Sequence, residues 1–172
     1  MHAPHNPPPA PRTAAPGAGG SRFTLLGVET ASDAWHLTAP DPEGGGVVRA
    51  IRGEIGGRDS SLIGHVNAHA TATEANDAAE AAAIGRAAPR AAVSATKGAS
   101  GHTLGAAGLV EAVWLLQSME AGVIPPVAGL ANAVEGVDVS PVVREREQTI
   151  GVSINLAFGG HNAAVAFLKE PA

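Results

Sequence analysis

A lysine and a histidine stand five residues apart in the glycine-rich segment 94–108, SATKGASGHTLGAAG. Lys97 supplies a cation, and His102 exchanges protons near neutral pH. A sharp turn between them would aim both side chains into one cleft, where burial and mutual charge shift pKa values. The pair is therefore a candidate for acid/base chemistry. An ordinary strand-to-helix connection with both side chains solvated at its rim is the alternative that this short motif leaves open.

Glycines make the same segment able to approach another backbone closely. They are Gly98, Gly101, Gly105 and Gly108, at spacings of three, four and three residues. On a helix this spacing places all four along one face. Gly98 and Gly101 are also predicted to supply the positive φ of a tight turn before the chain enters a helix.

An acidic residue interrupts the run 104–121, which is apolar nearly all round and predicts a helix buried on more than one side. Glu111 shares a helical face with Ser118, so we expect its carboxylate to be buried. A buried carboxylate needs a cation or a hydrogen-bond donor, and Lys97 or His102 is the candidate partner. A position for Glu111 at a solvent edge fits its spacing equally well.

Strands and helices must bring these groups together. Strands are predicted at 23–29, 62–68, 91–94, 150–156 and 163–168, and helices at 42–55, 74–88 and 104–121. His69 stands at the end of the second strand. Glu43 is expected in the first turn of the first helix, where the helix dipole favours a carboxylate. Thr73, Asp77 and Glu80 are expected to supply the cap and the acids at the start of the second helix.

The resulting order is βαβαβαββ, which predicts an α/β fold. Helical crossovers imply parallel strands, and the FGGHN connection between the last two strands is typical of a hairpin. We therefore expect buried helices against a mixed, mostly parallel sheet, with the hairpin adding an antiparallel edge.

The composition describes one globular domain, or one half of a larger fold. The chain has 172 residues, 45% of them hydrophobic and 16% charged. A net charge of −5 with 11 Lys+Arg argues against a nucleic-acid surface, and no apolar run reaches the ~20 residues that a membrane span needs. Residues 1–20 are predicted to be a disordered Pro/Ala/Gly-rich tail ahead of a domain at 21–172. A cytoplasmic location is the default expectation.

Four motifs in order resemble one enzyme family. The segments are GVETASDAWHLTAPDPEG, VNAHATATEANDAAE, SATKGASGHTLGAAGLVEA and FGGHNAAVAF. They are similar to the C-terminal half of the β-ketoacyl-acyl-carrier-protein synthases, and within them to the elongating type II condensing enzymes, over 27–168. The resemblance implies a thiolase-like fold, in which each half of the enzyme is one βαβαβαββ unit.

The resemblance also implies an active site. His69 and His102 match the two catalytic histidines of the family. Lys97 matches the lysine beside them, and Glu111 matches the buried acid that orients this polar cluster. The implied reaction is the decarboxylative Claisen condensation of malonyl-acyl-carrier-protein with an acyl thioester, in fatty-acid or polyketide chain elongation. No cofactor of its own is implied, because phosphopantetheine is carried by the acyl carrier protein.

Binding positions carry over from the family in the same way. Thr71 and Thr73 match residues that hydrogen-bond the phosphopantetheine arm, and Phe158 and Gly159 match the hairpin beside the substrate. Leu156 occupies the position of the family's gating phenylalanine, so the acyl gate differs here.

Partners and structural acids are implied as well. Asp77 and Glu80 match structural acids near the helix start. The implied partners are the acyl carrier protein, malonyl and acyl thioesters, an N-terminal ketosynthase half, and a second subunit in a homo- or heterodimer.

Two further departures from the family stand out. The chain contains no cysteine, so it lacks the nucleophile that holds the acyl group, and we expect it to be incomplete or inactive alone. The family's His-Gly-Thr-Gly-Thr reads His-Ala-Thr-Ala-Thr from His69, which is a mild change if Ala70 and Ala72 keep negative φ.

Two other functions are compatible with parts of this pattern. A non-catalytic partner resembling the chain-length factors of ketosynthases would use the fold for binding only, although it has no physical need for both histidines and the lysine. A metal-dependent hydrolase would draw on His69, Asp77, His102 and His161, but their spacing matches no zinc signature, and no metal is expected.

Overall fold

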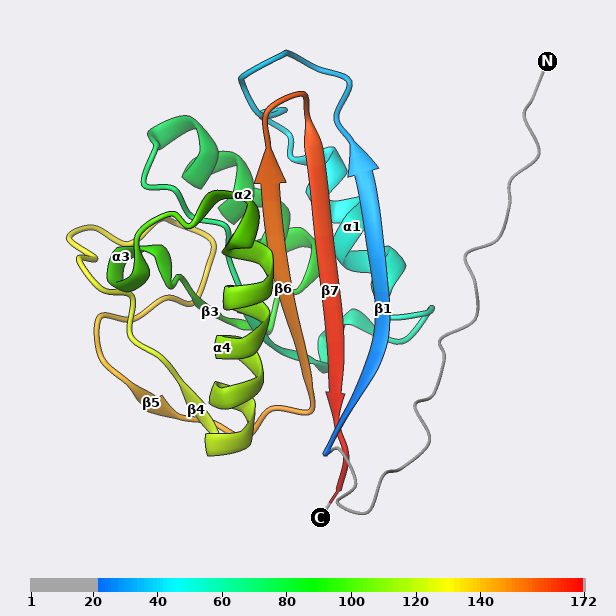
Figure 1. The fold of residues 1–172 in the computed structure, drawn as a ribbon, viewed down its shortest axis with the longest axis vertical. Helices are drawn as coiled ribbons and strands as arrows, with labels where there is room; N and C mark the ends of the chain where they lie inside the picture. Colours follow the sequence, from blue (N-terminus) through cyan, green and yellow to red (C-terminus); the bar gives the residue numbers. More distant parts are fainter. Residues whose placement is uncertain (1–21, 172) are drawn as a thin grey trace.

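The computed structural model describes residues 22–171 of the chain (Figure 1). The tail predicted at 1–20 lies outside the described residues. The strands are β1 (Phe23–Ser32), β2 (Ile63–Asn67), β3 (Ala92–Ser94), β4 (Val123–Ile124), β5 (Arg144–Glu145), β6 (Ile150–Ala157) and β7 (His161–Lys169). The helices are α1 (Gly45–Glu54), α2 (Glu74–Ala87), α3 (Lys97–Ser100) and α4 (Ala107–Ala121), with short 3₁₀ turns η1 (Ser60–Leu62) and η2 (Leu104–Ala106).

Five strands form the main sheet in the order β1-β7-β6-β2-β3. β2 runs parallel to β3 and β6, and β7 runs antiparallel to β6 and β1. The expectation of a mixed, mostly parallel sheet is therefore confirmed. The expectation that the hairpin forms an edge is wrong, because β1 pairs along the whole of β7, from Phe23 opposite Lys169 to Ser32 opposite His161. The strand β1 pairs with β7, the outer strand of the hairpin. The residues of the hairpin alone do not predict this pairing.

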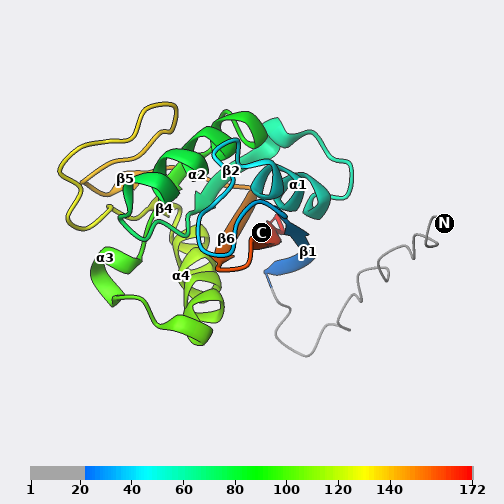
Figure 2. The ribbon, with the colours of Figure 1, turned by 90° about the horizontal axis from the view of Figure 1, so that it is seen from above.

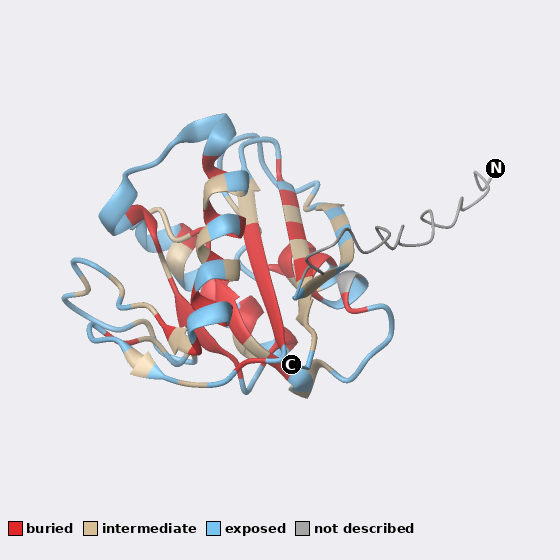
Figure 3. Cartoon of the chain, turned by 60° about the horizontal axis from the view of Figure 1, so that its bottom comes forward, coloured by how far each residue is buried: buried red, intermediate tan, exposed pale blue. Residues whose placement is uncertain are grey.

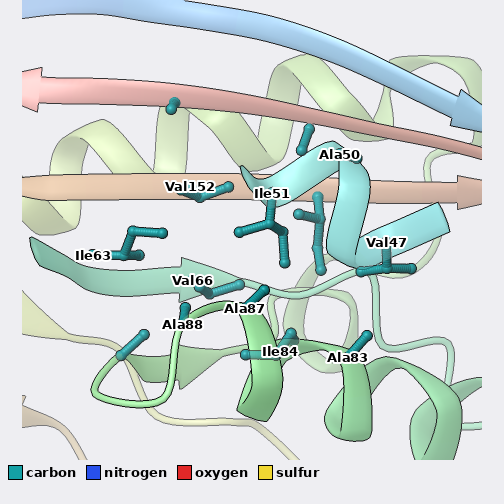
Figure 4. Close-up of a cluster of buried hydrophobic side chains, with 14 of the residues drawn as sticks. Val47, Ala50, Ile51, Ile63, Val66, Ala83, Ile84, Ala87, Ala88 and Val152 are labelled. Carbon is teal, nitrogen blue, oxygen red and sulfur yellow. The ribbon is translucent and has the colours of Figure 1, made fainter. Parts of the chain in front are cut away.

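Helices cover both faces of this sheet. Seen from above, α1 and α2 lie on one side and α4 on the other (Figure 2). Val47 and Ile51 of α1 and Ile84 of α2 meet Val66 and Val152 of the sheet in one apolar cluster (Figure 4). Each such buried side chain stabilises the fold by about 1.5–3 kcal/mol. Figure 3 shows the central strands coloured as buried, with exposed loops around the edge of the molecule. Within residues 22–171, no helix combines the length and apolar character required to cross a bilayer.

Helix α1 begins at Gly45 rather than at 42 as predicted. Gly44 precedes it with a φ of 56°, a left-handed conformation that ends the preceding loop. The carboxylate of Asp41 accepts hydrogen bonds from the backbone N–H groups of Glu43, at 3.0 Å, and Gly45, at 3.1 Å. The acid at the start of this helix is therefore Asp41, and the placement of Glu43 in the first turn is wrong.

The glycine-rich segment is divided into three short pieces. Helix α3 ends at Gly101, whose φ of 72° breaks the helix, and the chain passes through η2 into α4. The prediction that the four glycines share one helical face is therefore wrong. The prediction of positive φ is confirmed for Gly101 and is wrong for Gly98. Gly98 instead permits close packing, because a Cβ there would clash with the carbonyl oxygen of Ala128.

Strands β4 and β5 form a small second sheet that the sequence did not predict. Each strand has only two residues, which is too short to show a strand periodicity. Their antiparallel pairing closes the loop 125–143 beside α3 and α4 (Figure 1).

Candidate active site

Two histidines from distant parts of the chain meet at one end of the main sheet. His69 follows the end of β2, and His102 follows the break at Gly101. Their ring centroids lie 5.4 Å apart, with the ring planes at 83°. The side chain of His69 is buried, whereas that of His102 is exposed. The structure therefore places the two predicted histidines edge to face.

A buried ion pair lies in the same region. The Nζ atom of Lys97, at the start of α3, lies 2.5 Å from Oε1 of Glu111 in α4. The side chains are only 6% and 2% exposed. The predicted burial of Glu111 is confirmed, and its partner is Lys97 rather than His102. The second carboxylate oxygen, Oε2, is also buried and has no hydrogen-bond partner within residues 22–171.

The environment of His69 keeps its imidazole neutral. Burial, together with the nearby charges of Lys97 and His102, lowers the pKa of His69 from 6.5 to about 4, while a hydrogen bond with Asn155 opposes the shift. Near pH 7 the ring therefore carries one proton. A neutral imidazole of this kind donates one N–H bond without bringing a charge into the pocket.

The backbone orients the ring of His102. Its Nδ1 accepts a hydrogen bond from the N–H of Leu104 at 3.1 Å. Leu104 adopts a φ of 53°, which is uncommon for a residue with a branched side chain. Because Nδ1 is an acceptor, the proton of the neutral ring lies on Nε2. His102 therefore presents an N–H donor on its outer edge.

Glu80 holds the loop that carries His69. Its carboxylate accepts hydrogen bonds from the backbone N–H groups of His69, at 2.6 Å, and Ala70, at 2.8 Å, and from the side chain of Asn76 at 3.2 Å. Burial raises the pKa of Glu80 to about 7, although these two backbone bonds oppose the shift. The expectation that Glu80 acts at the start of α2 is wrong, because it lies beyond the first turn and faces the loop.

Helix α2 begins without the predicted side-chain cap. Thr73 occupies the N-cap position, but its side chain makes no capping hydrogen bond. Its hydroxyl lies 3.1 Å from that of Thr71 instead. Asp77 is in the first turn, as expected, and accepts a hydrogen bond from Asn76.

Two alanines in this loop have left-handed backbone conformations. The φ of Ala70 is 38° and that of Ala72 is 62°. The replacement of the family's glycines by Ala70 and Ala72 was expected to be mild if both alanines kept negative φ. That condition is not met. A Cβ in this region costs roughly 1–2 kcal/mol per residue. The loop between His69 and Thr73 is held in place at the cost of this strain.

The hairpin residues lie at the end of β6 and in the turn that follows. Leu156 is half-buried against the core, and Phe158 is 77% exposed. Gly159 has a φ of 84°, and its N–H donates to the carbonyl of Leu37 at 2.7 Å. The turn thus presents an aromatic ring on the surface and is tied to the loop after β1.

A second buried polar cluster was missed by the sequence interpretation. His65 and Asn67 of β2 contact Ser94 of β3, and His65 also contacts Gln148. A signal was present, because His65 and Asn67 alternate within the predicted strand 62–68 and His69 follows at its end, which places three polar side chains on one face.

The metal-hydrolase alternative has no support in the arrangement of these residues. Within residues 22–171, no group of three or more histidine, aspartate or glutamate side chains is placed to hold a metal ion. His69 and His102 are together, but Asp77 and His161 do not complete a ligand set with them.

Comparison with known proteins gives the family. Residues 22–131 match the model of the β-ketoacyl synthase C-terminal domain. The chain is 40% identical over 152 residues to 3-oxoacyl-[acyl-carrier-protein] synthase 2 of Mycobacterium leprae, a match that covers 83% of this chain and 36% of that protein. A chloroplastic synthase II of Arabidopsis thaliana is 36% identical over 152 residues, covering 83% of this chain and 28% of its own length.

Solved structures agree in fold. A β-ketoacyl synthase from Burkholderia phymatum superposes with a TM-score of 0.80 at 28% identity, over 89% of this chain and 39% of that one. The confirmed fold class is therefore the thiolase-like α/β fold of the ketosynthases. The chain spans little more than a third of the length of the M. leprae synthase. This chain belongs to the β-ketoacyl synthase family and matches its C-terminal domain.

Proposed function

We propose that this chain supplies the histidine and lysine side of a condensing active site that elongates acyl chains on an acyl carrier protein. The observation that carries the proposal is the edge-to-face contact of a buried, neutral His69 with His102 beside the ion pair of Lys97 and Glu111. Proteins named 3-oxoacyl-[acyl-carrier-protein] synthase are similar to this chain over most of its length, which supports the same reaction class.

The two imidazoles have the chemistry that the decarboxylation step needs. When the bond between the malonyl carboxylate and its neighbouring carbon breaks, carbon dioxide leaves and the electron pair passes to the thioester as an enolate. N–H donors from His69 and His102 would stabilise the negative oxygen of that enolate. One such donor is worth about 2.7–4 kcal/mol in comparable sites. A charged lysine nearby favours a neutral His69 and adds to the positive potential of the pocket.

The acyl group must be held by a second polypeptide segment. This chain has no cysteine, so a thiolate from an N-terminal ketosynthase half would carry the acyl thioester. The carbon nucleophile formed by decarboxylation attacks that acyl carbonyl, the new carbon–carbon bond forms and the thiolate leaves. The proposed contacts for the phosphopantetheine arm and the acyl chain are Thr71, Thr73 and the exposed residues Phe158 and Gly159. The last two lie close in sequence to Leu156, which occupies the gate position.

Reconstitution tests this function. The chain would be co-expressed with an N-terminal ketosynthase half that carries the cysteine, and malonyl-acyl-carrier-protein decarboxylation and condensation would be measured. His69→Ala and His102→Ala should each lower decarboxylation by roughly 10²–10³-fold, as expected for the loss of one oxyanion donor. His161→Ala, which removes an exposed histidine on the hairpin, is the matched control and should retain the rate. A stable complex without decarboxylation contradicts the proposal.

A non-catalytic partner role is the second candidate. A solved structure described as the ishigamide ketosynthase/chain length factor superposes with a TM-score of 0.81 at 30% identity, over 89% of this chain and 40% of that one. Because that description includes a chain length factor, this similarity is the observation that favours a chain-length-factor-like subunit. The two candidates differ in the reconstituted complex, because a binding-only subunit would give the same decarboxylation rate with and without His69.

A further inference from the structure

His65 lies fully buried in the middle of β2, apart from the residues proposed to contact substrate. Its Nδ1 lies 3.1 Å from Oε1 of Gln148, and its Nε2 lies 2.8 Å from Oγ of Ser94. The hydroxyl of Ser94 in turn lies 3.1 Å from Oδ1 of Asn67. These four side chains form a chain of hydrogen bonds, here called the relay, which ends two residues before His69.

Gln148 sets the direction of the relay at one end. Its Nε2 donates to the backbone carbonyls of Val123, at 2.9 Å, and Arg146, at 2.6 Å, so its Oε1 faces His65. An amide oxygen only accepts, and Nδ1 of His65 must therefore carry a proton. Ser118 does not alter this, because its hydroxyl donates to a carbonyl of its own helix at 2.8 Å.

The remaining bonds follow from that proton. In a neutral His65, Nε2 is then an acceptor and the hydroxyl of Ser94 donates to it. Ser94 has one proton, so it must accept from Asn67, which requires the amide of Asn67 to turn its Nδ2 toward Ser94. Oxygen and nitrogen of an amide are assigned from such networks. The rotation also removes an anomaly, since Nδ2 of Asn67 otherwise lies buried without a partner in the described chain.

A single direction of donation thus runs along the relay, from Asn67 through Ser94 and His65 to Gln148.

A neutral ring is also what the surroundings of His65 favour. Burial lowers the pKa of His65 to about 4, the charge of Arg146 adds to the shift, and the hydrogen bond with Gln148 opposes it. A protonated ring would donate from both nitrogens and would reverse Ser94 and Asn67.

We propose that His65 is a positioning residue, which as a neutral imidazole protonated on Nδ1 orients Ser94 and the amide of Asn67 at the strand end that leads to His69. The backbone joins the same groups, because the N–H of Ala68 donates to the carbonyl of Ser94 at 2.8 Å. Loss of the relay would therefore loosen the segment on which the buried catalytic histidine stands.

Nitrogen NMR of histidine-labelled protein tests the relay without any assay of activity. The ring of His65 should show a protonated Nδ1 and an unprotonated Nε2 throughout pH 5–8. A proton on Nε2 of the neutral ring, or titration near the ordinary pKa of about 6.5, overturns the proposal. Ser94→Ala should shift the Nε2 resonance of His65, and Ser118→Ala should leave it nearly unchanged.

Two replacements of His65 test its positioning role, which rests on the function proposed above. His65→Gln places an amide near the former Nε2 and can keep the bond with Ser94, whereas His65→Asn places one near the former Nδ1 and cannot. In the reconstituted complex we expect His65→Asn to lower malonyl decarboxylation roughly tenfold, the size expected for one lost hydrogen bond, with His65→Gln restoring most of the rate. Equal losses in both variants contradict the positioning role. If the complex that retains His65 has no decarboxylation activity, only the proposed function is contradicted. The NMR measurement still tests the relay independently.

Discussion

Lys97 and Glu111 form a buried ion pair whose closest atoms lie 2.5 Å apart, although the residues belong to different helices. A buried charge that loses its partner is strongly destabilising, so Glu111→Leu should lower the free energy of unfolding by about 3–5 kcal/mol. The double variant Lys97→Met/Glu111→Leu should recover most of that loss, because no charge is left unpaired. Urea unfolding of the three proteins measures both effects. A double variant no more stable than Glu111→Leu would show that the pair is not the cause.

The stability of the fold should decrease on mild acidification. The pKa values of His65 and His69 are both lowered to about 4 from 6.5, so the unfolded chain takes up their protons first. The stability linked to them is fully present above pH 6.5 and is lost as the pH falls through 4. The pKa of Glu80 is raised to about 7 from 4.5, so its contribution is present below pH 4.5 and lost as the pH rises through 7.

Between pH 6.5 and 4.5 two histidines therefore oppose one glutamate. We expect the free energy of unfolding to fall across this window, as measured by urea unfolding at several pH values. His69→Gln removes one titrating group and should make the decrease shallower. A decrease of unchanged slope in this variant would contradict the assignment of His69 as a buried, neutral group.

Two glycines of the segment 94–108 should differ in their tolerance of a side chain. A Cβ at Gly98 would clash with the carbonyl oxygen of Ala128, so Gly98→Ala must displace α3 or the neighbouring loop. We expect a loss of about 1–3 kcal/mol in unfolding free energy, as for overpacking, together with reduced decarboxylation because Lys97 begins the same helix. Gly105→Ala is the matched control, since a Cβ at Gly105 would meet no atom within 4 Å and the φ of this residue is not positive. Equal effects at both positions would rule out the steric explanation.

Relief of backbone strain should stabilise the loop after His69. Ala72 is exposed and has a φ of 62°, a conformation that glycine adopts without penalty. Ala72→Gly should therefore raise the midpoint of thermal unfolding, with a net gain of up to about 1 kcal/mol after the entropy cost of glycine. Ala82→Gly, at an exposed position within α2, should instead lose about 1 kcal/mol. A destabilised Ala72→Gly protein would show that the strain is not relieved at this position.

An exposed apolar face on α4 should be needed for assembly with the complementary half. Leu109 is 73% exposed and Val113 is 43% exposed, one helical turn apart. Leu109→Glu should abolish co-purification with an N-terminal ketosynthase half while leaving the unfolding midpoint of the chain itself within a few degrees. Val142→Glu, which changes a 63% exposed residue in the loop before β5, is the control and should still co-purify. Co-purification of Leu109→Glu at the level of the unchanged chain would place the contact elsewhere.

Local sequence patterns were sufficient for most of the helices and strands. The alanine-rich run predicts α2 to within one residue of its observed end, because alanine has the highest helix propensity and no glycine or proline interrupts the first turns. The β-branched run from Ile150 and the following hairpin were equally clear. The family motifs around His69 and His102 depend on short stretches of sequence, so the residues of the chain are enough to recognise them.

Long-range contacts decided the rest. The choice of Lys97 rather than His102 as partner of Glu111, the place of β7 in the interior of the sheet and the role of Glu80 beneath the His69 loop all join residues that are distant in the chain. The positive φ of Ala70 and Ala72 is set in the same way, because no local preference of alanine favours it. Sequence determines which residues are able to form an active site, but the packing of elements that are distant in the chain, such as α4 against the sheet, determines which of them meet, because burial energy acts between elements rather than along the chain.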